Sequence, residues 1–479
     1  MPRRPPPTDK PSALDAPSEG VLIRAENGDV VTWDETGLTL RLSDKVLADL
    51  RQRLPLPAPR QDARALGDID AWNLRDQDGW LFFDARFDPA LGPRTYRRSH
   101  AGGDIVAAAP GPLLGLFAIG GQRRAGFISR PPLFAQHIVA PGDDIGAVGL
   151  EGTATAQSTA KLQSVPWSTR ETLLAECLLQ DRLAQGRALP LHLCRAETDG
   201  STSVYDLPTG LAFANLLTAI DSGIAAARSL GTRLSVPAIA IDFGPEDRQC
   251  DAPTLAQGLR ALMARLEAEL IRRDIARPVF LLTAEAGTAR DTTHPAIAAH
   301  ATLSWRPGPH RLTIPAPGYM FEQTALGRPT DTARARMARM DAFALTEALA
   351  RRDWHCPTFL LAEAMDNQIR VTAQAMGPLV LSDALSPGPA LGFRLTGTTA
   401  RITAVTLAED DPKALILLTD ACATGGTLHY AHGAEPSPGA AGLPPNRGGI
   451  RDDWKADDPA GGPPLHRWAL PAILPVWGA

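Results

Sequence analysis

The stretch LLGLFAIGGQRRAG, from Leu113 to Gly126, decides how the rest of the chain is interpreted. Its apolar half has the length and composition of a strand that is buried on both faces, as in a parallel sheet. The run ends in a Gly-Gly pair and a polar turn, and open α/β folds keep their ligand sites at the carboxyl ends of such strands. This turn presents Gln122, Arg123 and Arg124. The sequence therefore predicts a ligand site at this edge of the sheet. The turn at this site carries no hydroxyl or thiol that could act as a nucleophile.

Strand and helix signals alternate downstream of this stretch. Helical periodicity starts near Ser168, where Ser168 or Thr169 is expected as the N-cap and Gly186 as the end signal. Short apolar runs between the helical segments have the character of buried strands. The alternation predicts a three-layer α/β/α sandwich with a parallel sheet. The expected helices are 168–186, 211–231, 254–274 and 331–352, and the expected strands are 189–196, 236–243 and 278–285.

Flanking segments of different composition predict additional modules. Residues 1–20 are expected to form a flexible tail, because they are rich in Pro, polar and charged residues. Residues 21–60 are expected to form an attachment module, with a hairpin at Asn27-Gly28, a helix at 44–53 and a linker at 54–60. Residues 61–356 are then the α/β domain. Short strand signals in 357–479 predict a small antiparallel β-domain.

The last segment of the chain is expected to lack regular structure and to be held onto that β-domain by its side chains. Arg447 and Arg451 are expected to pair with Asp452 and Asp453. Three tryptophans are expected to anchor the segment by packing, namely Trp454, Trp468 and Trp477.

Composition excludes several kinds of partner. The 479 residues carry a formal net charge of −5 without a basic patch, which argues against nucleic acid as a partner. No apolar run reaches the ~20 residues of a membrane span, and the N-terminus has no signal-peptide core, so we expect synthesis in the cytoplasm without membrane insertion. The five cysteines show no CxxC pair. His429 and His432 lack a third ligand at a suitable spacing, so neither a metal nor another cofactor is expected.

Two blocks of the chain carry a resemblance to a known family. GGQRRAG at 120–126 looks like the Gly-Gln-Ser turn of the SGNH hydrolases, in particular the sialate O-acetylesterase-like carbohydrate esterases, with Arg123 in the serine position. ETDGSTSVYDLPTG at 197–210 resembles the block that supplies the oxyanion-hole glycine of that family, with Gly200 at the glycine. The resemblance extends over roughly residues 100–352 and implies the SGNH fold.

Two further blocks match the family only in part. FGPED at 243–247 keeps the glycine and the final Asp247 of the third block but replaces its polar pair by Phe and Pro. ALGRPTD at 325–331 keeps Pro-Thr and has Arg328 where the catalytic histidine belongs. Because a guanidinium is neither nucleophile nor general base at neutral pH, the resemblance implies an esterase fold whose catalytic residues are degenerate.

Two interpretations of the catalytic residues stay open. If the alignment of the blocks is displaced, Ser129 or Ser201 would be the nucleophile and His294 the base. Otherwise the surviving groups form a binding site for the carboxylates and hydroxyls of acidic sugars. Its expected members are Arg123, Arg124, Asp199, Gly200, Ser201, Asp247 and Arg328.

A purely structural role is the alternative to ligand binding for these arginines. The same arginines would serve structure alone if they paired with carboxylates on a solvated rim. Candidate stacking platforms for sugar rings are Trp167, Tyr205 and Tyr319.

The closing residues 446–477 resemble the segment attached to esterase-like domains in proteins of phages and phage-derived particles. The resemblance implies a spike or fibre protein that binds cell-surface polysaccharide without cleaving it. Its N-terminal region would attach to another structural protein of the particle, and such appendages are usually homo-oligomers. Two alternatives remain: an active carbohydrate O-acetylesterase, and a purely structural particle component.

Overall fold

The computed structural model describes residues 66, 69–247, 249–458 and 461–478, together with three strands near the N-terminus. The chain divides into two compact units, Met1–Ala71 and Trp72–Ala479. In the first unit, β1 (Gly20–Ala25), β2 (Gly28–Asp34) and β3 (Gly37–Leu40) form an antiparallel sheet. The antiparallel pairing of β1 with β2 agrees with the hairpin expected there, whereas Asn27 itself, the tail, the helix at 44–53 and the linker at 54–60 lie outside the described residues.

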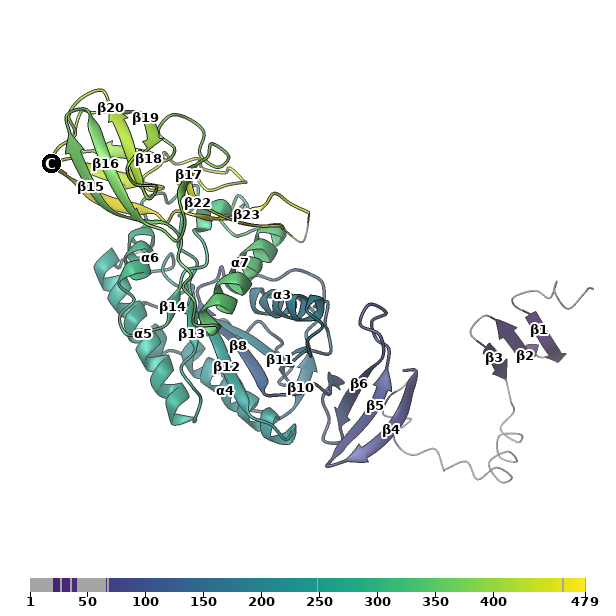
Figure 1. Cartoon of the computed structure of the whole chain (residues 1–479). Coiled ribbons are helices and arrows are strands. Elements are labelled where there is room, and N and C mark those ends of the chain that lie inside the picture. Colours follow the sequence, from purple (N-terminus) through teal and green to yellow (C-terminus); the bar gives the residue numbers. More distant parts are fainter. Residues whose placement is uncertain are drawn as a thin grey trace, which may run out of the picture. The chain divides into compact units, whose positions relative to one another are not determined.

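A seven-stranded sheet forms the middle layer of the second unit (Figure 1). Its order is β10-β9-β11-β8-β12-β13-β14, and every neighbouring pair is parallel except β10 with β9. The sheet grows in both directions from β8, so the crossovers on its two sides diverge next to that strand, where open sheets bind ligands. The strands are β8 Leu113–Gly120, β9 Ile138–Pro141, β10 Leu162–Ser164, β11 His192–Thr198, β12 Leu234–Ala240, β13 Val279–Leu281 and β14 Leu312–Thr313.

Helices cover both faces of this sheet, which confirms the three-layer sandwich. Side chains along β8 alternate between two cores: Phe117 and Ile119 pack with α4, α5 and α6, whereas Leu116 and Ala118 pack with α3 and α7. Both faces of β8 are therefore buried, which is why its sequence is apolar throughout instead of alternating. The helices are α3 Arg170–Ala184, α4 Leu211–Ser229, α5 Ala252–Arg272, α6 Pro295–Trp305 and α7 Asp331–Leu349, with short 3-10 turns at Leu207–Thr209 and Gly318–Met320.

The predicted helices form within a few residues of their expected bounds. Thr169 is the N-cap of α3, and its side chain accepts a hydrogen bond from the Thr172 N–H, as expected from the sequence. Helix α6 was not predicted. Its sequence, PAIAAHATLSW, consists largely of small and apolar residues, so it lacks the polar stripe that marks an amphipathic helix.

Two further β structures flank the sandwich. A four-stranded sheet precedes it, and a mainly antiparallel β-domain of seven and three strands follows it. The β-domain was expected to be antiparallel, and most of its strand pairs are. The exception is β15, which pairs in parallel with β24, the last strand. The first sheet comprises β4 Ala71–Gln77, β5 Trp80–Ala85, β6 Arg94–Ser99 and β7 Val106–Ala107. The β-domain comprises β15 Thr358–Met365, β16 Gln368–Gln374, β17 Leu379–Leu381, β18 Phe393–Thr396, β19 Ile402–Leu407, β20 Ala414–Thr419, β21 Thr427–Tyr430, β22 Ile450–Ala456, β23 Leu465–Trp468 and β24 Ala472–Gly478.

The closing segment differs from its prediction. It contains β22, β23 and β24 and is therefore regular. Asp452 of β22 pairs with Arg467 of the neighbouring strand β23 at 2.7 Å, and Arg451 donates to the backbone carbonyl of Asp452 instead. Trp454 packs edge-on against Trp354, whereas the side chain of Trp477 is 59% exposed instead of packed into the β-domain.

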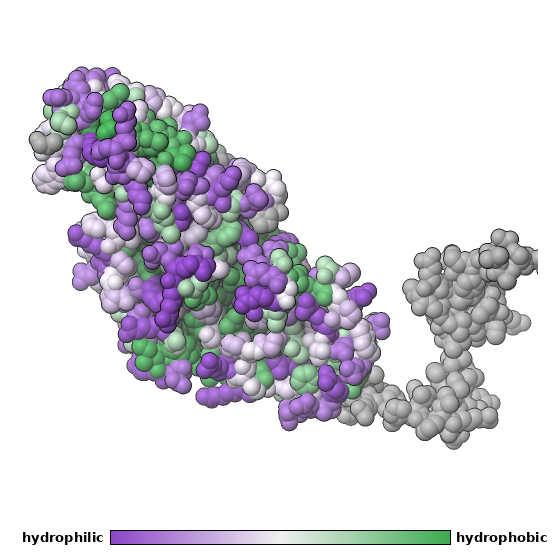
Figure 2. Space-filling model, viewed as in Figure 1, coloured by the Kyte–Doolittle hydropathy of each residue, from purple (hydrophilic) through white to green (hydrophobic). Residues whose placement is uncertain are grey.

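No helix in the described part of the chain combines the length and the apolar character that crossing a membrane requires. Figure 2 shows hydrophilic and hydrophobic residues interspersed over the sandwich and a gathering of hydrophobic residues on the β-domain. Exposed apolar side chains of β15 and β24 are Leu360, Leu361, Met365, Ile473 and Trp477.

Candidate binding site

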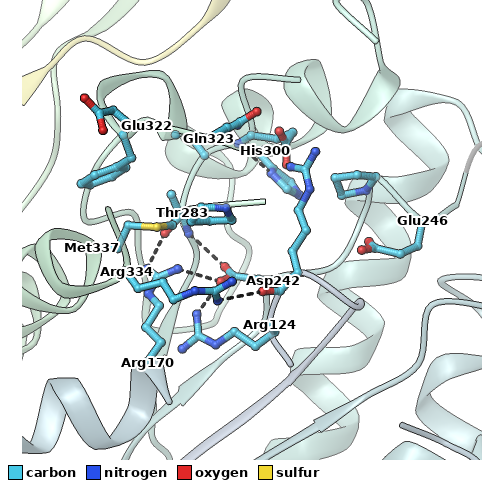
Figure 3. Close-up of a pocket in the computed structure, with 17 residues that line it drawn as sticks. Arg124, Arg170, Asp242, Glu246, Thr283, His300, Glu322, Gln323, Arg334 and Met337 are labelled. Carbon is cyan, nitrogen blue, oxygen red and sulfur yellow. Dashed lines mark hydrogen bonds and ion pairs between the residues drawn. The ribbon is translucent and has the colours of Figure 1, made fainter. Parts of the chain in front are cut away.

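A pocket of about 70 Å³ opens at the carboxyl edge of the parallel sheet (Figure 3). Its walls come from the turns that follow β8, β12 and β13 and from the start of α7. These strands are parallel neighbours, so their ends lie side by side. The lining combines apolar side chains, among them Phe321 and Met337, with many charged and polar ones, namely Arg123, Arg124, Arg170, Asp242, Glu246, Glu285, Glu322, Gln323 and Arg334.

Arg123 lies between two glutamates at the pocket. Its Nη1 atom lies 2.6 Å from Oε2 of Glu285, whose other carboxylate oxygen accepts the backbone N–H groups of Ala286 and Gly287. Burial alone would lower the pKa of Arg123, but Glu285 and Glu246 outweigh it, and the pKa is raised. Arg123 is thus a fixed cation in the pocket wall.

Glu246 lies directly over the Gly-Gly turn. A Cβ atom on Gly121 would fall 1.8 Å from the Glu246 carboxyl carbon, so only glycine leaves room for this carboxyl group. Burial raises the pKa of Glu246, whereas that of Glu285 is lowered, because Arg123 and His300 outweigh the burial of Glu285. The pKa values of the two glutamates are therefore shifted in opposite directions, although both carboxyl groups lie beside Arg123.

The floor of the pocket is a buried ion network. Arg124 pairs with Glu171 of α3 at 2.6 Å and with Asp242, which follows β12. Arg170 at the start of α3 contacts Asp242 at 2.9 Å and Asp341 of α7 at 2.7 Å. The network therefore ties α3, α7 and the ends of β8 and β12 together beneath the pocket.

The two aspartates of this network differ in the direction of their pKa shifts. Burial raises the pKa of Asp341 despite its contact with Arg170, whereas Arg124 and Arg170 together outweigh burial and lower the pKa of Asp242. Arg170 also donates to the Thr283 hydroxyl at 2.5 Å. The donors of the two arginines are thus directed at groups of the protein.

The structure brings some of the predicted site residues together. Arg123, Gly200 and Arg328 line a second pocket, which shares Glu246 and Glu285 with the first. Arg124 does not belong with them as a ligand-binding residue: it is 4% exposed, and its guanidinium is engaged by Glu171 and Asp242. It forms part of the interior ion network instead of a solvated rim.

The remaining predicted residues make local contacts. Asp199 accepts hydrogen bonds from the backbone N–H and the hydroxyl of Ser201, both at 2.8 Å, which forms a closed turn after β11. Asp247 accepts the backbone N–H of Val204 at 2.9 Å. These three side chains stabilise loops beside the second pocket and are not among the residues that line it.

Among the described residues lining the two pockets, none is a serine or a cysteine. His300 is 2% exposed, and both of its ring nitrogens are used by backbone groups: Nδ1 accepts from the Glu285 N–H and Nε2 donates to the Phe243 carbonyl. Its pKa is lowered by burial. His300 therefore has no ring nitrogen left to act as a general base. His294 caps α6 by accepting the Ala296 N–H.

The three aromatic residues predicted to stack on sugar rings differ in their exposure. Tyr319 is completely buried and donates its hydroxyl proton to the Ala469 carbonyl at 2.5 Å, so it is a core residue and cannot stack on a sugar. Trp167 is half exposed and stacks on Phe127 with ring centroids 4.8 Å apart. Tyr205 is 53% exposed. Trp167 and Tyr205 therefore remain candidates.

Several residues of the site were not identified from the sequence. Glu285 lies at the end of a predicted strand and could have been identified as an edge residue, but nothing in the sequence pairs it with Arg123. Arg334 lies in the first turn of α7, where an arginine has the character of a surface residue. Asn446 comes from the distant β-domain region and carries no motif.

Asn446 connects the region after β21 to the rim of the pocket. It is 1% exposed, accepts the Ala434 N–H at 2.8 Å and donates to the carbonyls of Ala286 and Thr292. The segment between those carbonyls includes Thr288 and Asp291, which line the second pocket. Asn446 is thus a positioning residue for the pocket.

Replacing Asn446 by alanine is expected to lower the free energy of unfolding by about 2–3 kcal/mol, because it leaves buried backbone groups unpaired. Amide hydrogen exchange in residues 286–293 should accelerate more than exchange in α4, which Asn446 does not contact. Gln368→Ala, an exposed polar substitution in β16, is the control. Unchanged exchange in 286–293 would contradict the positioning role.

Comparisons with known proteins identify a similar structure but no family. No family model matches the chain, and no curated protein does. Among solved structures, the chain is similar to XAC1771, described as a novel carbohydrate acetylesterase from Xanthomonas citri, with a TM-score of 0.47 and 15% sequence identity. The alignment covers 79% of this chain and 97% of that chain. This similarity concerns the arrangement of the secondary-structure elements.

Proposed function

We propose that this protein binds a cell-surface polysaccharide at the carboxyl edge of its parallel sheet and does not cleave it. The observation that carries the proposal is the turn after β8, which presents Arg123, ion-paired to Glu285. By the resemblance of this turn to a Gly-Gln-Ser turn, Arg123 stands in the position of the serine. The pocket offers guanidinium donors together with carboxyl and amide acceptors. Such a mixture suits the hydroxyls and carboxylates of sugars.

Acyl transfer would need a nucleophile and a base in contact with each other. The hydroxyl of Ser201 is directed at the Asp199 carboxylate, and Ser129 is exposed in the segment between β8 and β9. His294 uses Nδ1 to cap α6. An O-acetylesterase would therefore have to assemble its catalytic groups away from the arrangement described above.

We further propose that the protein is an oligomeric spike or fibre of a phage or phage-like gene-transfer particle. Two observations support this context. The closing segment resembles those of particle proteins, and the small sheet β1–β3 belongs to a unit separate from the sandwich, as an attachment module would.

The test measures acetate release from an O-acetylated bacterial polysaccharide and retention of the same glycan by the purified protein. We expect retention without acetate release, with a competent esterase as the positive control. Acetate release that follows the protein through purification would contradict the proposal and favour the esterase. Absence of both would favour a purely structural role.

Arg123→Gln should weaken retention of the glycan about tenfold or more, because it removes a charged donor from the pocket wall. Arg370→Gln is the matched control, since Arg370 forms an exposed ion pair with Asp410 in the β-domain. Equal retention by both variants would exclude Arg123 from the binding site.

A further inference from the structure

Arg334 is a buried cation without a carboxylate partner. It lines the first pocket from the first turn of α7 and is 8% exposed. Its one hydrogen bond is a long contact of 3.5 Å from Nη1 to the backbone oxygen of Arg123, and its Nε atom is buried without a partner. Four of the other buried arginines each have a carboxylate partner: Arg124, Arg170, Arg195 and Arg467. Buried Arg97 has other partners, because it donates to the Leu230 carbonyl and lies over the Trp80 ring.

The surroundings of Arg334 disfavour its charge. Burial is the main cause that lowers its pKa, and Arg170, Arg328 and Arg124 lower it further, against an opposing contribution from Asp331. The positive end of the α7 dipole acts in the same direction as these arginines. A cation held under such conditions suggests a functional group, because structure alone would favour an apolar residue there.

Space for this guanidinium is created by Gly126. A Cβ atom at residue 126 would lie 2.0 Å from both Nη atoms of Arg334. The head group thus lies against bare backbone on one side, and it forms part of the wall of the first pocket on another. Gly126 follows the turn that carries Arg123 and Arg124, so the loop after β8 shapes the cation's position.

We infer that Arg334 binds the carboxylate of an acidic sugar, such as a uronic or sialic acid residue, within the polysaccharide. This inference rests on the proposed function and names its ligand class. A guanidinium binds a carboxylate through two parallel N–H···O bonds. Glu322 and Gln323 on the same wall offer acceptors for sugar hydroxyls. The carboxylates around the pocket disfavour a dianion such as a phosphate ester, so a monoanionic, hydroxyl-rich ligand fits best.

The experiment compares the binding of oligogalacturonate and oligosialic acid with that of their methyl esters, by calorimetry on the full chain. Esterification removes the charge and keeps the sugar. We expect wild-type protein to bind at least one acid about tenfold more tightly than its ester. Arg334→Met should bring that ratio close to one. Gly126→Ala should reduce it, because the added methyl displaces the guanidinium.

A stability measurement separates this role from a structural one. Arg334→Met should raise the thermal midpoint, because it replaces an uncompensated buried charge by an apolar side chain. Arg336→Met on the same helix is the matched control: Arg336 pairs with Asp458 at 3.1 Å, so this variant should lower the midpoint and keep the acid preference.

The outcomes distinguish this inference from the proposed function. Glycan binding by the wild type without a preference for the acid, or a preference that persists in Arg334→Met, would overturn the inference alone. A large loss of stability in Arg334→Met would also overturn it, since Arg334 would then be structural. Failure of the wild type to bind any glycan, charged or esterified, would overturn both.

Discussion

Replacing Arg170 by methionine is expected to lower the free energy of unfolding by about 3–5 kcal/mol. The substitution leaves Asp341, which is completely buried, without its ion-pair partner, and it removes one of the two cations that compensate Asp242. It also removes the ion pair that links α3 to α7 beneath the pocket. Chemical denaturation at neutral pH measures the loss as a lower midpoint at an unchanged slope.

Two comparisons test whether burial causes this loss. Arg265→Met removes a pair between half-exposed Arg265 and Glu269 in α5, and it should cost less than about 1 kcal/mol because Glu269 keeps Arg272 and Arg273 as partners. The double variant Arg170→Met/Asp341→Leu should lose less stability than the sum of the two single variants, because no buried charge is left alone. Additive losses would mean that the two residues stabilise the fold independently of their contact.

Replacing Glu197 by glutamine is expected to remove a pH dependence of stability between about pH 4.5 and 7. Glu197, at the end of β11, is completely buried, and burial raises its pKa to about 7 from the ordinary 4.5. Arg195 lies 3.3 Å away but is shared with Asp143, so the pair Arg195–Asp143 is already neutral. Glu197 is the second carboxylate beside this one arginine, and it therefore favours its protonated form.

The direction follows from proton binding. Folded protein holds the Glu197 proton up to about pH 7, whereas unfolded protein releases it near pH 4.5. This contribution to stability is fully present below pH 4.5 and is lost as the pH rises through 7. The loss amounts to about 3 kcal/mol. Glutamine keeps the shape without the charge, so above pH 7 the variant should be more stable than the wild type by an amount of that order.

The measurement is the difference in unfolding free energy between variant and wild type from pH 4.5 to 8. Buried His137 and His192 have pKa values lowered to about 4 and about 3, which destabilises the protein as the pH falls below 6.5. These contributions cancel in the difference. Glu409→Gln, in an exposed loop, changes the net charge equally and should leave the pH dependence in place. A difference that does not vary with pH would show that Glu197 is ionised throughout.

The layers of the fold were predictable, because each element has a local signature. The apolar run 113–120, the cap at Thr169 and the alternation that follows indicate buried strands and amphipathic helices, and the structure confirms them. Helix α6 was missed because it is apolar on nearly all sides. The parallel pairing of β15 with β24 was missed because pairing between strands about a hundred residues apart leaves no pattern in either sequence.

The place of the site was predictable, but the roles of its residues were less so. The carboxyl edge follows from strand order, and Arg123 and Arg328 do line a pocket there. Arg124 follows Arg123 directly in sequence yet faces inward, since neighbouring residues of a turn point in different directions. Its partners Glu171 and Asp242 lie 47 and 118 residues away. Partners at such separations are determined by packing, which residue type and spacing do not encode.

The three hydrogen bonds of Asn446 have a consequence for how this protein can evolve. A recombination junction near residue 357 would look convenient, because the sandwich ends there and the β-domain begins. Any β-domain acquired through such a junction would arrive without the amide that holds the carbonyls of Ala286 and Thr292. Exchange of the β-domain alone is therefore expected to disturb the rim of the pocket, so we expect variation in ligand preference to arise by substitution within the chain rather than by exchange of domains.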